Sequence, residues 1–558
     1  MMKHPMNKLW IALLLLTMVN FGPVTVFAQT QPGFLVVAPD RGFLGNQETK
    51  KLFEQFQLHY PAALAFVGDT YGNHGTAYTA YVKNAFKQLR ALNAKSVVVI
   101  PLFLSDADPQ LQAIRNLLPA HADGLTVEWA PSMSESYLIG QILLDRVQDI
   151  SQSPEDERLI LIGIGARDEQ SEQAIKKDLA RILEYIQRYR EFRDSEIVVY
   201  YHRDAENARE TNDGITAHIT KQAARQGRTL VVPAFIGVKF DHMMAMTNWI
   251  QRKFQKLNVV FQPSEITPHS NLLVWLKKTA NQYLSDVAPG EIGVVIMPHG
   301  SIQPYNDAIE EVVAPLTNRY QIEMAYGMGD SAIIQQAVSR LEQRGVKKIV
   351  FGRMYGLVEH MKAKTDYILG LSDEYVHELQ QGRTPPAQIR SAAIFSTFGG
   401  YEQGADIAQV LHERIMEISQ NPSEETVILL AHGTKTDEDN QAWLSVINAN
   451  IEKLRQDPHC AKLKTIKAMT VREDWPELRE KAVKEVREFI EESSKTGKVL
   501  VISNRLYGSG QYSKMLDGLD FELNGKGFLS PVIEQWLDQS IQQVTERLKG
   551  PVRLAEKS

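Results

Sequence analysis

Two histidines in the second half of the chain stand where a metal ion could be bound. His299 follows an apolar run in the segment Pro298-His-Gly-Ser301, and His360 follows another apolar run 61 residues later. A pair of neutral imidazoles with oxygen donors suits divalent cobalt, nickel, iron or zinc better than magnesium or calcium. Asp330 or Met328, in the segment between the histidines, could complete the ligand set. This pattern predicts a shared metal site, and two separate capping histidines are the alternative.

The apolar run before His299 is one of four that recur along the 558 residues. The runs begin at residues 34, 159, 292 and 427, so their starts lie 125, 133 and 135 positions apart. A recurring unit of this length is a small domain or half of one. The chain is therefore predicted to be a fourfold array, in which the third unit alone carries both histidines.

Within each unit, short β-branched runs alternate with amphipathic stretches. In unit three we expect strands at 294–297, 322–326 and 348–351, and helices at 306–316 and 331–344. In unit one we expect strands at 34–38, 63–67 and 96–105, and helices at 47–58 and 76–92. Such alternation is typical of a parallel sheet covered on both faces. The predicted fold class is α/β, with two doubly wound parallel-sheet domains of two similar halves each.

This architecture explains why the histidines matter. In doubly wound sheets, ligands bind outside the carboxyl ends of the strands. Neighbouring strands lie about 4.8 Å apart, so loops that follow two neighbouring strands can bring their side chains around one ion. His299 and His360 follow the first and third strands of unit three.

The chain is expected to divide into a signal peptide and two domains. We expect a signal peptide in residues 1–28 and an N-terminal domain in 29–287, with halves 34–150 and 159–285. The C-terminal domain is expected in 288–550, with halves 291–418 and 427–548. Lys3 and Lys8 precede a short apolar segment, and Val26-Phe-Ala28 offers small residues for cleavage. The mature chain is expected to work in the periplasm or outside the cell, and an uncleaved anchor is the alternative.

Composition limits the classes of partner. The formal net charge is −6, without the basic excess of a nucleic-acid-binding protein, so no nucleic acid partner is predicted. After signal cleavage, no stretch of the sequence is long and apolar enough to be expected to cross a membrane. Cys460 is the single cysteine, which rules out an intramolecular disulfide and a cage of thiolates. It is predicted to be a spectator near a turn.

The arrangement in unit three resembles the class II tetrapyrrole chelatases, the sirohydrochlorin cobalto- and ferrochelatases of the CbiX, SirB and CbiK type. Pro298-His-Gly-Ser301 is similar to their first-strand motif, and Glu359-His360 lies where they place a second histidine. Residues 96–105 are similar to their third strand. The resemblance covers all four units as a fold, but the functional motif is complete only in unit three.

The resemblance implies insertion of cobalt or iron into an anionic tetrapyrrole such as sirohydrochlorin, bound with the metal between two half-domains. His299 and His360 would bind the ion and help to take the pyrrole protons, with Asp330 as the assisting acid in place of an expected glutamate. Three cations would meet the carboxylates of the macrocycle, unless they are simply solvated: Arg353, Lys362 and Lys364.

The other units depart from this motif. At the first position, unit one has Asp40 and unit two has Ile164. Unit four keeps His432 but has Gln511-Tyr512 at the second position. Replacement of His432 is therefore expected to matter less than replacement of His299. The N-terminal domain is predicted to be a decayed or repurposed copy.

Unit two keeps a histidine only at the later position, His242, which we predict as a further metal ligand. His202, or His74 from the facing unit, could pair with it. The neighbouring thioethers are soft ligands for haem iron or copper, although packing is the commoner role of methionines at helical spacing: Met243, Met244 and Met246.

Two other functions remain open at this point. The first is a non-catalytic periplasmic carrier of cobalt, nickel, iron, haem or another tetrapyrrole, which could tolerate the loss of one histidine. The second is a solute-binding protein of an importer, although its lobes would differ from a fourfold array of short units.

Overall fold

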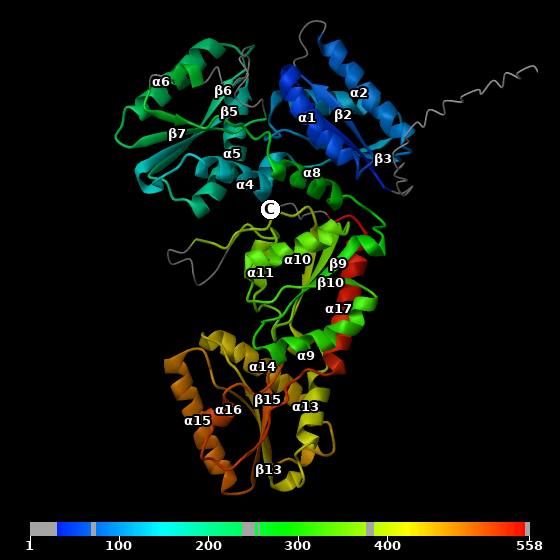
Figure 1. Cartoon of the computed structure of the whole chain (residues 1–558), viewed down its shortest axis with the longest axis vertical. Helices are drawn as coiled ribbons and strands as arrows, with labels where there is room; N and C mark the ends of the chain where they lie inside the picture. The colour runs from blue at the N-terminus through cyan, green and yellow to red at the C-terminus, as the bar shows by residue number, and fades with distance from the viewer. Residues whose placement is uncertain are drawn as a thin grey trace, which may run out of the picture.

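Each of the four units folds around its own sheet of four parallel strands in the computed structural model, which describes residues 31–68, 74–202, 204–236, 251–254, 257–374 and 384–552 (Figure 1). In every sheet the second strand lies at one edge, followed by the first, third and fourth. The α/β fold class with repeated halves is therefore confirmed. No helix among the described residues is both long and apolar enough to span a bilayer.

The strands of the N-terminal half are β1 Gly33–Pro39, β2 Ala62–Val67, β3 Ser96–Pro101, β4 Thr126–Trp129, β5 Glu157–Ala166, β6 Asp194–Tyr201, β7 Arg228–Pro233 and β8 Val259–Phe261. Its helices are α1 Gly42–Gln57, α2 His74–Ala91, α3 Pro109–Leu117, α4 Tyr137–Gln148, α5 Glu169–Tyr189, α6 Ala208–Ala223 and α8 Ser270–Gln282.

The strands of the C-terminal half are β9 Ile292–Met297, β10 Gln321–Met324, β11 Lys348–Arg353, β12 Ile394–Phe398, β13 Glu425–Ala431, β14 Thr465–Thr470, β15 Lys498–Asn504 and β16 Glu522–Asn524. Its helices are α9 Gln303–Val313, α10 Ser331–Gln343, α11 Lys362–Ile368, α12 Tyr401–Gly404, α13 Ile407–Met416, α14 Asp437–Leu454, α15 Pro476–Ser494, α16 Tyr512–Met515 and α17 Pro531–Lys549.

The central strands match the sequence prediction, but a fourth strand in each unit was not predicted. These fourth strands, β4, β8, β12 and β16, are three to five residues long and lie at a sheet edge. An edge strand is covered less completely, so it needs no continuous apolar run. The central strand β9 is buried along its whole length, whereas β4 has no fully buried residue.

Helices exchanged between neighbouring units join the units in pairs. The helix that follows β4, α4, packs on β7 of unit two, and α8 of unit two packs back on β3. In the same way α13 packs on β15 of unit four, and α17 returns to β11 and β12 of unit three, as Figure 1 shows for the C-terminal helix. Units one and two therefore depend on each other, as do units three and four.

The second and fourth units also begin with the same local structure. Ser151 Oγ donates a hydrogen bond of 2.7 Å to Glu157 Oε2, and Ser419 Oγ donates to Glu425 Oε2 in the same way. Both glutamates are 1% exposed. A buried carboxylate needs such donors to offset its desolvation. This serine–glutamate hydrogen bond, shared by units two and four, indicates that the repeating element of the chain is a pair of units.

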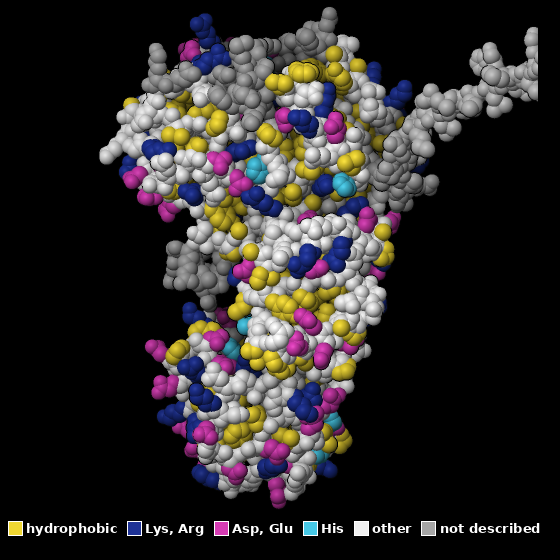
Figure 2. All heavy atoms as spheres, in the orientation of Figure 1, with side chains coloured by type: hydrophobic (Ala, Val, Ile, Leu, Met, Phe, Trp, Pro, Cys, Tyr) yellow, Lys and Arg dark blue, Asp and Glu magenta, His cyan; other side chains and the backbone are white. Residues whose placement is uncertain are grey.

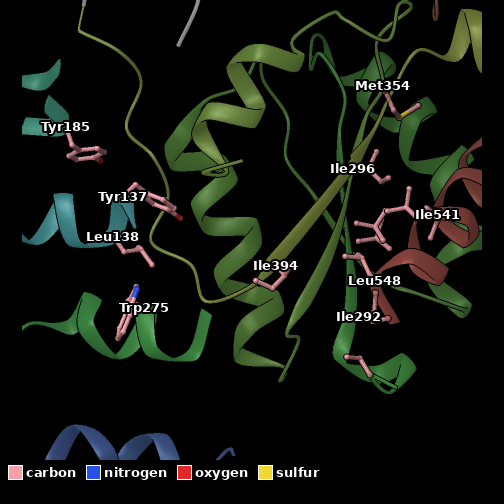
Figure 3. Close-up of a cluster of buried hydrophobic side chains, with 14 of the residues drawn as sticks. Tyr137, Leu138, Tyr185, Trp275, Ile292, Ile296, Met354, Ile394, Ile541 and Leu548 are labelled. Carbon is pink, nitrogen blue, oxygen red and sulfur yellow. The ribbon is translucent and has the colours of Figure 1, made fainter. Parts of the chain in front are cut away.

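The two pairs meet through a continuous buried core. Figure 3 shows Tyr137 and Leu138 of α4 and Trp275 of α8 near Ile394 at the start of β12. Lys278 Nζ in α8 donates a 2.8 Å hydrogen bond to the backbone oxygen just before β12. The third unit is therefore held by α17 on one side and by the N-terminal pair on the other.

Candidate functional site

Two histidine loops with the same geometry lie at the carboxyl ends of β9 and β13. His299 Nδ1 lies 2.7 Å from the backbone oxygen of Gly300, and His432 Nδ1 lies 2.8 Å from that of Gly433. A carbonyl oxygen only accepts, so Nδ1 must carry the proton in both rings. The Nε2 lone pair of His299 then remains for a metal ion or a proton, whereas Nε2 of His432 faces a carboxylate.

The glycines make these turns possible. Gly300 and Gly433 have φ angles of 75° and 83°, in the left-handed region that side chains disfavour. A Cβ on Gly300 would lie 3.2 Å from the backbone nitrogen of Gly327, and one on Gly433 would lie 2.9 Å from that of Arg472. Each His-Gly pair therefore turns tightly against the loop after the neighbouring strand.

A repeated asparagine supports each loop from the following helix region. The backbone nitrogen of Ser301 donates to Asn306 Oδ1 at 3.0 Å, and that of Thr434 donates to Asn440 Oδ1 at 3.2 Å. Unit one keeps this brace with Asn46, but Asp40 takes the place of the histidine and caps its own loop. Unit one therefore retains the loop structure without the imidazole.

His360 lies on the loop after β11, beside the loop that carries His299. β11 pairs in parallel with β9, with Arg353 opposite Met297 at the ends of the strands. His299 is exposed, whereas His360 is half-buried. The structure thus places both predicted ligands at neighbouring strand ends of unit three, and the shared ion remains a prediction.

His360 faces unit four. Its ring meets the Trp443 indole edge to face, with 5.2 Å between centroids. Burial lowers the pKa of His360, Asp439 raises it and His432 lowers it. His360 is therefore close enough to His432 for their charges to interact, so imidazoles approach this junction from both units. In Figure 2, histidine side chains gather at the junction of these units, where the surface is indented.

Beneath Trp443 lies a buried carboxyl group, Glu402 of α12. Trp443 Nε1 and Asn504 Nδ2 each donate a 2.9 Å hydrogen bond to Glu402 Oε2. The other oxygen, Oε1, has no hydrogen-bond partner among the described residues. Burial raises the pKa of Glu402 to about 7, against the opposing effect of these two donors. A Cβ on Gly356 would lie 2.5 Å from Oε1, so a glycine is needed for the carboxyl to fit beside the His360 loop.

His432 has an acidic partner of its own. Its Nε2 lies 3.2 Å from Asp474 Oδ2, and the Trp475 ring meets it edge to face at 6.1 Å. Asp474 is exposed, so the ion pair is open to solvent. At the position where unit three has His360, unit four buries Tyr512 near Arg505, which pairs with Glu473.

Asp330 starts α10. Its Oδ1 accepts hydrogen bonds from the backbone nitrogens of Ala332 and Ile333 at 2.8 and 3.0 Å, as an N-cap. Lys364 Nζ donates to the backbone oxygen of Met328 at 2.7 Å. Burial lowers the pKa of Lys364, and the nearby Asp330 raises it. Both residues thus hold the second loop of unit three, and the acid role of Asp330 remains a prediction.

The other two predicted cations share one carboxylate. Arg353 is 1% exposed, and its Nη1 lies 3.9 Å from Asp366 Oδ1. Arg353 Nη2 also donates to the backbone oxygen of Val358 at 3.2 Å, which supports the His360 loop. Lys362 Nζ lies 2.9 Å from Asp366 Oδ2 and is partly exposed. Lys362 is therefore placed better than Arg353 to meet an anionic ligand.

His242 and the three methionines beside it lie outside the described residues, as does the His74 side chain. His202 is described, and lies near the half-buried Asp108. Burial raises the pKa of Asp108, whereas Arg41 and His202 lower it. Arg41 and Asp108 line a small cavity of about 30 Å³ at the junction of units one and two. This junction differs in chemistry from the one that holds His360.

The sequence analysis missed Glu402, Trp443 and Asn504. Glu402 follows β12, a fourth strand that the sequence pattern does not predict, so no functional loop was expected after it. Trp443 lies on a helix face, where an aromatic residue reads as part of the core. The available signal was the segment Phe398-Gly-Gly-Tyr-Glu402, in which a carboxylate follows two glycines directly after a strand.

Comparison with known proteins yields structural matches alone. No protein-family model matches the chain, and no curated protein does. SirB from Bacillus subtilis, solved with Fe3+, is 18% identical over 45% of this chain and 96% of its own, with a TM-score of 0.33. DR2241 from Deinococcus radiodurans is described as a multi-domain protein with structural similarity to chelatases and two additional novel domains. It is 11% identical over 47% of this chain and 56% of its own, with a TM-score of 0.29. Each of the two matches covers a little under half of this chain.

Proposed function

We propose that the C-terminal pair of units inserts a divalent metal, cobalt or iron, into an anionic tetrapyrrole such as sirohydrochlorin. The supporting observation is that imidazoles approach the junction of units three and four from both sides, with His360 in the electrostatic range of His432. The metal ion and the macrocycle are the substrates in this proposal.

The chemistry needs groups that can hold an ion and accept protons. Insertion must strip water from the ion and remove two pyrrole N–H protons, and the metal keeps its oxidation state. His299 has its Nε2 lone pair available, because its Nδ1 faces a carbonyl. The lowered pKa of His360 favours its neutral form near pH 7, in which one ring nitrogen is a base. The two histidines thus suit metal delivery and proton removal.

Glu402 and Trp443 act as positioning residues in this proposal. Glu402 holds the indole through a 2.9 Å hydrogen bond, and the indole packs against His360. The partly exposed Lys362 is the candidate for pairing with a carboxylate of the macrocycle, since its present partner is an acid on the same helix.

The test is the rate of Co2+ or Fe2+ insertion into sirohydrochlorin, followed by the absorbance of the macrocycle. We expect His299→Ala and His360→Ala each to lower the rate by about 100-fold or more, the scale of a lost acid–base group. The matched control is His218→Ala, which removes an exposed histidine of α6 that pairs with Glu196.

The same assay separates an enzyme from a carrier. Wild-type protein that binds metal or macrocycle stoichiometrically, but gives no turnover above the uncatalysed rate, would contradict the enzyme proposal and support a carrier. We also propose that residues 1–28 direct export, so that this chemistry takes place outside the cytoplasm. Cell fractionation and the N-terminal mass of the mature chain test this, with Gln29 as the expected first residue.

A further inference from the structure

A second set of metal-ligating side chains lies where α13 packs against unit four. His412 is on α13, and Asp457 and Cys460 lie on the turn between α14 and β14. One ligand atom from each of the three lies within 4.8 Å of the others. Among the described residues, this is the one group of three or more such side chains close enough to share an ion.

We propose that His412, Asp457 and Cys460 bind one zinc-type divalent cation, separate from the insertion site. Imidazole nitrogen, carboxylate oxygen and thiolate sulfur are the ligands that Zn2+ takes in tetrahedral sites, with bonds of about 2.0 to 2.3 Å. Donors in such a site lie about 3.6 Å apart by that geometry. The three ligand atoms therefore need only small side-chain rotations to surround an ion, and a water molecule completes the set.

The turn holds two of the ligands in place. Asp457 Oδ1 accepts hydrogen bonds from the backbone nitrogens of His459 and Cys460, at 2.8 and 3.0 Å. His412 Nε2 lies 3.4 Å from Asp457 Oδ1. Cys460 is 1% exposed and packs in the core, so its sulfur cannot move far.

A metal ion that binds the Cys460 sulfur must displace the proton of its thiol. The metal-free Cys460 side chain is a buried free thiol. When a divalent ion binds, the S–H bond breaks, the proton leaves to solvent and the thiolate becomes a ligand. No oxidant or reductant takes part.

The location suggests a structural role for the ion. α13 is the helix that unit three contributes to unit four, and it packs against α14 and β15. A metal bridge from His412 to the turn after α14 would pin this exchanged helix. The same packing positions Trp443, in α14, against His360.

His459 offers a matched control beside the cluster. Its Nε2 lies 2.8 Å from Ser419 Oγ, the hydroxyl that also donates to Glu425. It is therefore held away from the group formed by His412, Asp457 and Cys460. His459→Gln changes an adjacent imidazole and leaves all three proposed ligands in place.

The test is Co2+ titration of the full mature chain, observed in the near ultraviolet for the cobalt–thiolate charge-transfer band. Cys460 is the only cysteine in the chain, so this band reports this site alone. We expect the band in wild-type protein, in His459→Gln and in the His299→Ala/His360→Ala double variant. We expect Zn2+ to abolish it by displacement, at one equivalent of ion.

Three variants identify the ligands. Cys460→Ser should remove the band, and His412→Gln and Asp457→Asn should each weaken Co2+ binding by about tenfold or more. Asparagine keeps an oxygen that can accept from the two backbone nitrogens, so Asp457→Asn separates loss of the ligand from loss of the turn. A wild-type protein without the band, or equal Zn2+ binding by wild type and Cys460→Ser, would overturn the proposal. Neither readout depends on insertion activity.

Discussion

The Trp443 indole packs edge to face on the His360 imidazole, with 5.2 Å between centroids, although the two residues belong to different units. Trp443 is in turn hydrogen-bonded to Glu402, which returns to unit three. The environment of His360 is therefore set by a neighbour 83 positions later in the chain. Four predictions follow from this arrangement and from the loops around it.

Trp443→Ala should raise the pKa of His360 toward the ordinary histidine value of about 6.5. Burial is the largest cause of its lowered pKa, and Trp443 is the aromatic ring that covers it. The measurement is titration of the imidazole signals by NMR, with His360→Gln used to assign its resonance. Trp475→Ala is the control, since that ring packs on His432. An unchanged His360 titration in Trp443→Ala would show that another group excludes water.

Glu402→Gln should change how stability depends on pH. The pKa of Glu402 is about 7 in the folded state and near 4.5 in the unfolded chain. Between these values the folded state binds more protons, so the free energy of unfolding falls as pH rises. Glutamine cannot ionise and avoids this loss. Relative to wild type, the variant should gain about 2 kcal/mol between pH 5 and pH 7.

Urea unfolding at pH 5, 6 and 7 measures this difference. The control is Glu477→Gln, which removes an exposed carboxyl at the start of α15. Its difference from wild type should stay constant over the same range. A constant difference for Glu402→Gln as well would mean that the buried carboxyl is ionised throughout, contrary to this expectation.

Gly433→Ala should destabilise the protein more than Gly300→Ala. Both sites have positive φ angles, which cost an L-residue about 1 to 2 kcal/mol. The added Cβ would also lie 2.9 Å from a backbone nitrogen at Gly433, but 3.2 Å at Gly300. Chemical denaturation measures both. Gly290→Ala is the control, because its Cβ would meet no atom within 4 Å. Equal stability of all three variants would show that the histidine loops adjust freely.

His432→Ala should slow metal insertion by about tenfold or more if the imidazoles act together. The sequence of unit four alone predicted that replacing His432 would have a small effect on insertion, because that unit lacks a second histidine. The structure instead puts His432 within electrostatic range of His360. Insertion rates for His432→Ala, compared with His218→Ala, decide between these expectations. A rate equal to that of wild type would confine the site to unit three.

Local patterns in the sequence were enough to predict the repeat, the central strands and the histidine loops. A buried strand such as β9 needs a continuous apolar run, and a His-Gly turn after it is visible in the sequence without knowledge of any partner. The same logic failed for edge strands such as β16, because their few residues are only partly covered and carry no such run.

Tertiary structure alone decided what surrounds each functional group. The packing of units three and four brings α14 beside the His360 loop, so a tryptophan of unit four becomes the neighbour of an imidazole of unit three. Exchange of α13 brings His412 beside Cys460, a residue that the sequence predicted to be a spectator. The physical reason is the distance along the sequence between the residues that each property depends on. Periodicity and turn residues report contacts within one element, whereas burial, pKa and metal-ligand geometry depend on side chains that are distant in sequence and meet only when the units pack.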